Sequence, residues 1–242
     1  MYEPFFEIEV LPTPKQPKKK YNKFIINSFF IGIFFSVLIL GWLESRLMCH
    51  YNLPSDCRTK INTWNVYVDT TNILQKGSVI ILISNFIENI KKINKWIIAL
   101  YLGLFFVTGP IFALAGEFPG MQTSLATFTV GFNLSFIVYL SCLVITVLLL
   151  FYEFLKIFKY YGKFYLSIYG ISRFLIILYY FVFSLILSKQ NYHIHIHHLY
   201  IGFIIACLAH DHKWISGISL AIGSGIMVQG IGSYNYATII QD

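Results

Sequence analysis

Residues 24–44 read FIINSFFIGIFFSVLILGWLE, an apolar run whose only ionisable side chain is Glu44 at its end. A helix that crosses the hydrocarbon core of a bilayer needs about 20 mostly apolar residues, so this stretch predicts a membrane span. The whole chain agrees, because 57% of its 242 residues are hydrophobic and only 12% are charged. Soluble domains carry about 25% charged residues. The composition therefore excludes a disordered chain, a fibrous repeat and an ordinary soluble enzyme.

Further apolar stretches predict an all-α protein, a polytopic transmembrane helical bundle with six to seven spans. The clear stretches after the first are 96–116, 123–151, 165–188, 196–209 and 214–232. The last two are separated by the polar tetrad His210-Asp211-His212-Lys213, so we expect a tight helical hairpin with a solvated turn. Segment 77–90 has only 14 residues, and it fits a thin span, a re-entrant piece or an interfacial helix.

The domain organisation follows from the same pattern. Residues 1–23 form a basic arm, and the positive-inside rule predicts that this arm and the N-terminus are cytoplasmic. Residues 24–242 form a single transmembrane helical domain with a polar loop at 45–76. We expect the lipid bilayer and other membrane subunits as partners. Nucleic acid is not expected as a partner, because the basic residues flank membrane spans.

The distribution of lysine and arginine tests whether 77–90 crosses the membrane. If it crosses and the N-terminus is cytoplasmic, 12 basic residues lie inside and 5 outside. Six spans with an external N-terminus give 11 against 6, so seven spans are favoured. The inside residues would be Lys15, Lys18, Lys19, Lys20, Lys23, Lys91, Lys92, Lys95, Lys156, Lys159, Lys163 and Lys213, and the outside residues Arg46, Arg58, Lys60, Lys76 and Lys189.

Two cysteines lie eight residues apart near the start of the polar loop. Cys49 and Cys57 would form a disulfide if this loop faces an oxidising space, and would otherwise remain thiols. The favoured seven-span topology places them outside, which suits a disulfide.

Polar residues inside apolar runs are costly in a membrane and often functional. Arg173 and Asn133 each lie about ten residues into their predicted spans, near the bilayer midplane, so we expect them to contact each other. This intramembrane polar pair would be structural glue between helices or part of a substrate or ion path. The last span also aligns small residues, among them Ser216, Gly223 and Gly230, which predicts close helix packing.

Four histidines within six residues form the one group that suggests chemistry: His193, His195, His197 and His198. Neutral imidazole is the commonest metal ligand near neutral pH. Either a helical or an extended backbone would bring two or three of these side chains to one face. Glu117 falls on the same membrane side, and Asp69 joins it if 77–90 crosses. The sequence thus offers a zinc or iron site at the outer membrane boundary, with Glu117 or Asp69 as candidate catalytic bases. The alternative is a helix end whose histidines contact headgroups and backbone carbonyls.

The carboxy-terminal part reads HIHIHHLYIG, then a polar turn, then SGISLAIGSGIMVQGIGSY. This pattern resembles the C-terminal signature of an uncharacterised family of polytopic membrane proteins from protists and fungi. In that family an H-x-H-H motif precedes an aromatic residue, a helix, a turn and a glycine-rich helix. The resemblance implies kinship over about 45 residues and supplies no activity. The matching residues are His195, His197, His198, Tyr200, Gly202, Ser219, Gly225 and Gly230.

Three functions remain open at this point. The first is a structural or accessory membrane component that contacts lipid and would bind a metal ion through the histidines. The second is a metal-dependent enzyme that acts on a lipid at the outer membrane boundary. The third is a transporter or channel whose path is lined by Arg173 and Asn133. We favour the first, because the sequence contains no complete catalytic set; whether the protein is an enzyme stays open.

Overall fold

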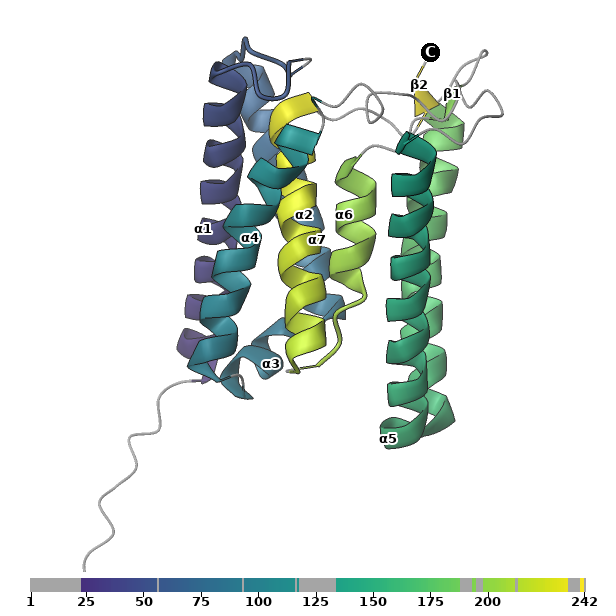
Figure 1. Ribbon diagram of the computed structural model, residues 1–242. Coiled ribbons are helices and arrows are strands. Elements are labelled where there is room, and N and C mark those ends of the chain that lie inside the picture. Colours follow the sequence, from purple (N-terminus) through teal and green to yellow (C-terminus); the bar gives the residue numbers. More distant parts are fainter. Residues whose placement is uncertain are drawn as a thin grey trace, which may run out of the picture.

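The computed structural model describes residues 23–55, 57–92, 94–115, 117, 134–187, 193–194, 198–211, 213–234 and 240–241. Within these residues every element of secondary structure is a helix, apart from one pair of two-residue strands (Figure 1), which confirms the all-α class. Strand β1 (His193–Ile194) pairs antiparallel with β2 (Ile240–Gln241). The helices are α1 (Lys23–His50), α2 (Thr63–Ile83), α3 (Phe86–Lys92), α4 (Lys95–Ala115), α5 (Leu134–Leu187), α6 (His198–Cys207) and α7 (Trp214–Tyr234).

Helix α7 is the centre of the bundle. In the most apolar stretch of α7, 78% of the residues are buried. The corresponding stretches of α1 and α4 are 22% and 17% buried, so these two helices present most of their surface outward. Glycines on different faces of α7 allow the neighbours to approach. Gly225 meets the backbone of Phe105 on α4, and Gly232 meets Ser45 on α1.

The closest approach is between α6 and α7. A Cβ atom added to Gly223 would lie 2.3 Å from the backbone nitrogen of Ala206, and one added to Gly202 would lie 2.4 Å from that of Met227. No side chain fits between two backbones at this separation. The predicted hairpin of two helices with a small-residue contact face is thus confirmed.

Helix α2 begins much earlier than hydropathy indicates. Asn62 caps its N-terminus, because the Asn62 side chain accepts a hydrogen bond from the Asn65 N–H. The polar loop expected at 45–76 is therefore wrong in its bounds, since α1 continues to His50 and only 51–62 connect it to α2. After Ile83 the chain turns through Asn85, whose φ is 50°, and α3 continues at 64° to α2.

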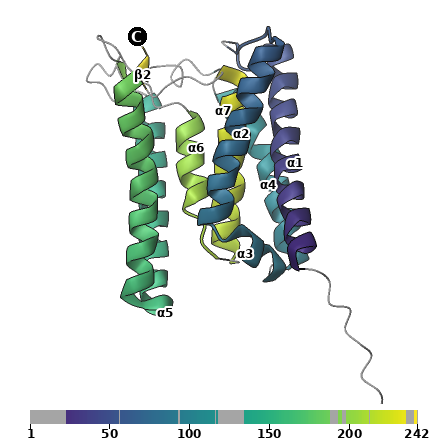
Figure 2. The ribbon, with the colours of Figure 1, turned by 180° about the vertical axis from the view of Figure 1, so that it is seen from behind.

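Helix α5 consists of two helices that run side by side in opposite directions (Figures 1 and 2). They meet at Gly162, whose φ of 80° suits glycine because other residues rarely adopt it. The second half corresponds to the apolar stretch predicted at 165–188. Of the stretch predicted at 123–151, residues 123–133 lie outside the described residues.

Three of the described helices are long and apolar enough to cross a membrane: α1 from Phe24, α4 and α7. The bent pair α2 and α3 would make a fourth if the two act as one broken span. Helix α6 has 10 residues and is about 15 Å long, half the thickness of a bilayer core. The apolar helices therefore support a membrane-embedded protein, and the number of six to seven spans stays a prediction.

Candidate functional site

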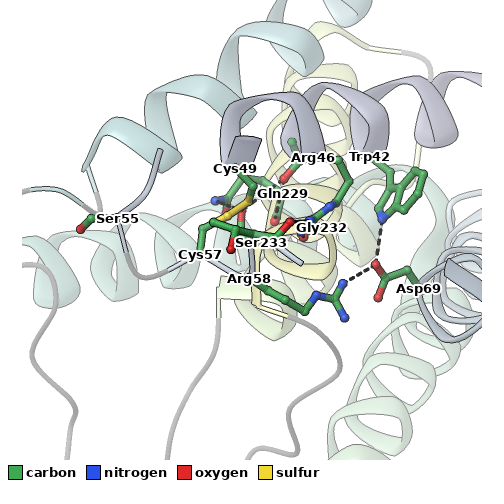
Figure 3. The surroundings of a disulfide bond; sticks show 12 residues. Trp42, Arg46, Cys49, Ser55, Cys57, Arg58, Asp69, Gln229, Gly232 and Ser233 are labelled. Atoms are coloured by element: carbon green, nitrogen blue, oxygen red, sulfur yellow. Dashed lines mark hydrogen bonds and ion pairs between the residues drawn. A yellow bond between two sulfur atoms is a disulfide. The ribbon is translucent and has the colours of Figure 1, made fainter. Parts of the chain in front are cut away.

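A disulfide between Cys49 and Cys57 closes the loop that follows α1 (Figure 3). The next residue, Arg58, donates its backbone N–H to the Ser233 carbonyl at 2.9 Å. The loop is thereby held against the C-terminal end of α7. We call this end of the bundle the disulfide end. Of the two states that the sequence left open for Cys49 and Cys57, the structure has the disulfide.

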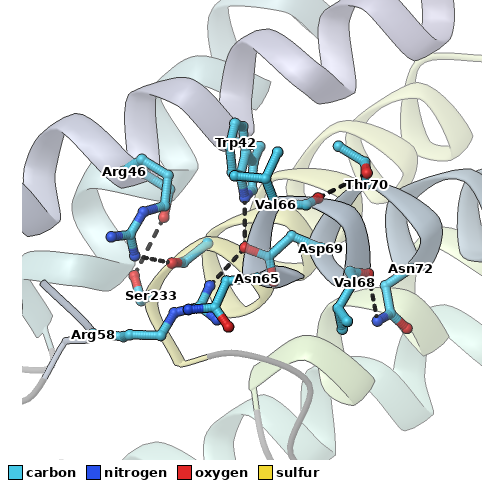
Figure 4. A network of polar contacts seen from close by, with 12 residues as sticks. Trp42, Arg46, Arg58, Asn65, Val66, Val68, Asp69, Thr70, Asn72 and Ser233 are labelled. Atoms are coloured by element: carbon cyan, nitrogen blue, oxygen red, sulfur yellow. Dashed lines mark hydrogen bonds and ion pairs between the residues drawn. The ribbon is translucent and has the colours of Figure 1, made fainter. Parts of the chain in front are cut away.

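Asp69 lies at the centre of a polar network at the disulfide end (Figure 4). Its side chain is fully buried, and one carboxylate oxygen accepts hydrogen bonds from Arg58 at 2.6 Å and from the Trp42 indole at 3.0 Å. Burying a carboxylate is tolerable only with such partners. Asp69, a candidate base of the metal-dependent enzyme, thus joins α1, α2 and their connecting loop through these contacts.

Arg46 satisfies one carbonyl group at the end of α7 and one in the loop between α1 and α2. Its guanidinium donates to the Gly232 carbonyl at 2.7 Å and to the Thr59 carbonyl at 3.3 Å. The last carbonyls of a helix lack partners within the helix and carry partial negative charge, so a buried arginine is stabilising there. Arg46 and Arg58 together join α1, the loop after it, α2 and the end of α7.

The predicted metal ligands are only partly described. Glu117 accepts a hydrogen bond from the Ser55 backbone N–H, which places it at the disulfide end. His193 is in β1 and His198 begins α6, and nothing is described of their side chains. His195 and His197 lie outside the described residues. Among the side chains that are described, no group of three or more histidine, cysteine or acidic residues could hold a metal ion.

A second polar cluster lies at the opposite end, where α6 connects to α7. Lys156 forms an ion pair with Asp211 at 2.7 Å and with Glu153 at 3.0 Å. The Ser216 hydroxyl donates to Glu153 at 3.2 Å. Asp211 is only 8% exposed, so the expectation of a solvated turn is wrong for it. The turn is folded inward because Lys156 on α5 supplies the charge that Asp211 needs.

The environment shifts the pKa values of two groups in this turn, Asp211 and His210. Burial acts to raise the pKa of Asp211, but hydrogen bonds from Lys156 and from the Lys213 N–H outweigh it, so this pKa lies below its usual range. Burial and the positive charges of Arg173 and Lys156 lower the pKa of His210 below 6.5. The His210 imidazole is therefore neutral at pH 7 and packs edge-on against the rings of Tyr161 and Tyr169.

Arg173 connects α5 to the ends of two other helices. It donates hydrogen bonds to the Ile83 carbonyl at the end of α2 (2.9 Å) and to the Cys207 carbonyl at the end of α6 (3.1 Å). Its guanidinium also lies 4.0 Å from the ring of Tyr169. These contacts favour the structural interpretation of Arg173, because they satisfy helix carbonyls that lack intrahelical partners. Asn133, the predicted partner of Arg173, lies outside the described residues.

Sequence reasoning missed Lys76, which was assigned to the outer loop. The structure buries Lys76 completely in α2, where its ammonium group donates to Asn72 at 2.9 Å and lies near the rings of Tyr180 and Tyr200. The signal was present in the sequence as a helical period. The buried positions of α2 recur every three or four residues: Asp69, Asn72, Ile73, Lys76, Gly77, Ile80 and Ile81.

Comparison with known proteins adds no relative: no protein-family model, no curated protein and no solved structure matches this chain.

Proposed function

We propose that this protein is a multi-pass integral membrane protein that serves as a structural or accessory component in contact with lipid. One observation carries the proposal: several charged side chains are buried between the helices, while large apolar side chains are exposed along them. Asp69 and Lys76 are fully buried, and Arg173 and Asp211 are each 8% exposed. The exposed apolar side chains of two helices are Phe24, Ile25, Phe29, Ile33, Leu40, Leu43 and Leu47 on α1, and Leu100, Val107, Ile111 and Leu114 on α4.

The two ends of the bundle suggest its orientation. The α3–α4 junction, the Gly162 bend and the α6–α7 connection lie together at one end (Figure 1), which we call the lysine end. By the positive-inside rule this end would be cytoplasmic, and the disulfide end would then face an oxidising compartment. Basic residues at the lysine end outside the buried cluster include Lys91, Lys92, Lys95, Lys159, Lys163 and Lys213.

Exposed aromatic residues near both ends support the same placement. Tyr51, Trp64 and Tyr67 are exposed at the disulfide end, and Trp96 and Trp214 at the lysine end. Tryptophan and tyrosine are enriched at the two membrane–water boundaries, because their rings are apolar and their N–H or O–H groups are polar. Two such belts favour a chain that crosses the bilayer over one that lies on its surface.

A structural or accessory role is favoured because the described buried charges are engaged within the protein. Asp69 is held by Arg58 and Trp42, and Lys156 by Asp211 and Glu153. Groups held in this way stabilise the packing between helices, and releasing them for catalysis would leave an uncompensated buried charge.

The test is extraction of the full-length protein from membranes. We expect it to remain in the membrane pellet after washing with alkaline carbonate or urea, and to dissolve only in detergent. A peripheral membrane protein of the same cells serves as the control that such washing removes. Release of the chain by carbonate would contradict the proposal.

A further inference from the structure

A cavity of about 90 Å³ lies between α1, α3, α4 and α7 at the lysine end. Most of its wall is apolar. Besides Tyr101 on α4, four polar residues lie along the side nearest the α6–α7 connection: Ser84, Asn89, Asp211 and Ser216. The apolar residues that matter for its shape are Ile33 and Phe34 on α1, Ile90 on α3, Ile98 and Leu102 on α4, and Leu220 on α7.

These four polar residues are engaged by the protein itself. Ser84 donates its hydroxyl to the Ile80 carbonyl, and Asn89 donates its amide to the Ser84 carbonyl, both at 2.6 Å. Ser216 donates to Glu153, and Asp211 pairs with Lys156. An occupant would therefore find apolar surface and few free hydrogen-bonding groups. A cavity of about 150 Å³ with Leu, Ile and Phe walls stays dry and binds benzene. The mostly apolar wall of this smaller cavity therefore suits an apolar occupant.

The cavity borders the outer surface of the bundle. Ile33 is both a wall residue and 40% exposed, and Ile97 and Ile98 are partly exposed. In a membrane this surface faces lipid tails. The wall is thus reached from the lipid side, between α1 and the start of α4.

Exposed lysines lie next to the cavity opening between α1 and the start of α4. Lys91 and Lys92 follow the wall residue Ile90, and Lys95 precedes the wall residue Ile97. One acidic side chain, Glu88, lies 3.8 Å from Lys92 and is itself 77% exposed, which leaves an excess of two positive charges. Lys91 also donates to Asn27, so its ammonium group lies beside α1, six residues before the wall residue Ile33. Trp96 is 72% exposed at the same level and fits the membrane–water boundary.

We propose that this site binds one acidic phospholipid, with part of an acyl chain in the cavity and the headgroup beside Lys91, Lys92 and Lys95. The proposal rests on the proposed membrane location and deepens it by naming the lipid class. An apolar cavity selects a hydrocarbon segment, and the three lysines select a negative headgroup at the depth where a phosphate lies.

Two variants separate the parts of the site. Gly217 lines the cavity, and a Cβ atom there would lie 3.4 Å from Ile97, an ordinary contact. Gly217→Leu would fill the cavity, and Gly217→Ala is the milder substitution should the leucine variant not fold. The triple variant K91Q/K92Q/K95Q removes the positive charge. The matched control is K159Q/K163Q, which removes lysines from the same end of the bundle at the bend of α5.

The experiment measures which lipids stay bound to the full-length protein in detergent, by native mass spectrometry after incubation with phosphatidylglycerol or phosphatidylcholine of equal chain length. We expect one phosphatidylglycerol to be retained at least about tenfold better than phosphatidylcholine, since each lysine contributes roughly fivefold at an anionic surface. The triple lysine variant should lose this preference, and Gly217→Leu should lose retention of both lipids. K159Q/K163Q should behave as the wild type.

Three results would overturn the proposal. They are equal retention of the two lipids, an effect of K159Q/K163Q as large as that of the triple variant, and full retention by Gly217→Leu. A further arm adds glycerol phosphate, which has the headgroup chemistry without the chain; displacement of the lipid at equal concentration would show that the cavity plays no part. The membrane location is tested separately by carbonate extraction, whose result does not depend on the lipid headgroup.

Discussion

The guanidinium of Arg58 lies 2.6 Å from the carboxylate of Asp69, which is completely buried. Arg58 follows the disulfide-bonded Cys57, so the loop, the disulfide and the ion pair hold α1, α2 and the end of α7 together.

We predict that Arg58→Met lowers the free energy of unfolding by about 3 kcal/mol, because it leaves the Asp69 carboxylate buried without its cation. The double variant R58M/D69N should be more stable than Arg58→Met alone, since the uncompensated charge is gone. Thermal unfolding in detergent measures both. Lys60→Met is the control, because Lys60 is an exposed cation of the same loop. An Arg58→Met protein as stable as Lys60→Met would show that the ion pair is dispensable.

Gly223→Ala should destabilise the protein by about 3 kcal/mol or prevent folding, because the added methyl group would lie 2.3 Å from a backbone nitrogen of α6. The matched control is Gly103→Ala on α4. Nothing lies within 4 Å of a Cβ atom at Gly103, and alanine favours helix, so stability there should stay equal or rise slightly. Equal melting temperatures for the two variants would contradict the close packing of α6 and α7.

The lowered pKa of His210 predicts a loss of stability in mild acid. The unfolded chain binds a proton near pH 6.5 while the folded protein resists it, so stability falls as the pH drops below that value. The charged side chains that act on the pKa of His210 are Arg173 and Lys156, which lower it, and Asp211, which raises it. His210→Phe keeps a ring against Tyr161 and Tyr169 but cannot titrate. When the pH is lowered from about 7.5 to about 5.5, the melting temperature of His210→Phe should fall less than that of the wild type. An equal fall in both proteins would contradict the role of His210.

The metal site at His193, His195, His197 and His198 stays a prediction. It predicts that the purified protein contains zinc or iron in stoichiometric amount by elemental analysis, and that His195→Ala and His198→Ala each remove it. His210→Phe is the control, because His210 belongs to the opposite end of the bundle. Protein that is fully folded and free of metal would reject the site.

The sequence predicts the apolar helices better than the polar contacts between them. Residues 24–44 and the glycine-rich last helix could be assigned directly, because long apolar runs and small-residue spacing are local properties. The start of α2 at Thr63 could not be assigned from hydropathy, since Asp69, Asn72 and Lys76 lower the average over that stretch. Their burial depends on partners that are distant in the sequence, such as Trp42 for Asp69 and Tyr180 for Lys76.

The turn between α6 and α7 makes the same point for the candidate site. A tetrad of histidines, aspartate and lysine is typical of a solvated turn. The cation that makes burial of the Asp211 carboxylate tolerable is Lys156, 55 residues earlier in the sequence. Positive-inside counting grouped most of the lysines at one end as the fold does, because it depends on the order of spans rather than on contacts. It failed for Lys76, which lies inside α2.

The central claim, that the chain spans a membrane with its lysine end and disulfide end on opposite sides, is tested most directly by sided labelling. Cys142 and Cys207 are replaced by alanine and the disulfide is kept, and single cysteines are introduced as Lys60→Cys and Lys163→Cys. Both positions are exposed, one at each end. In sealed membranes we predict that a membrane-impermeant maleimide labels Lys163→Cys only from the cytoplasmic side and Lys60→Cys only from the other. Labelling of both positions from the same side would contradict the account.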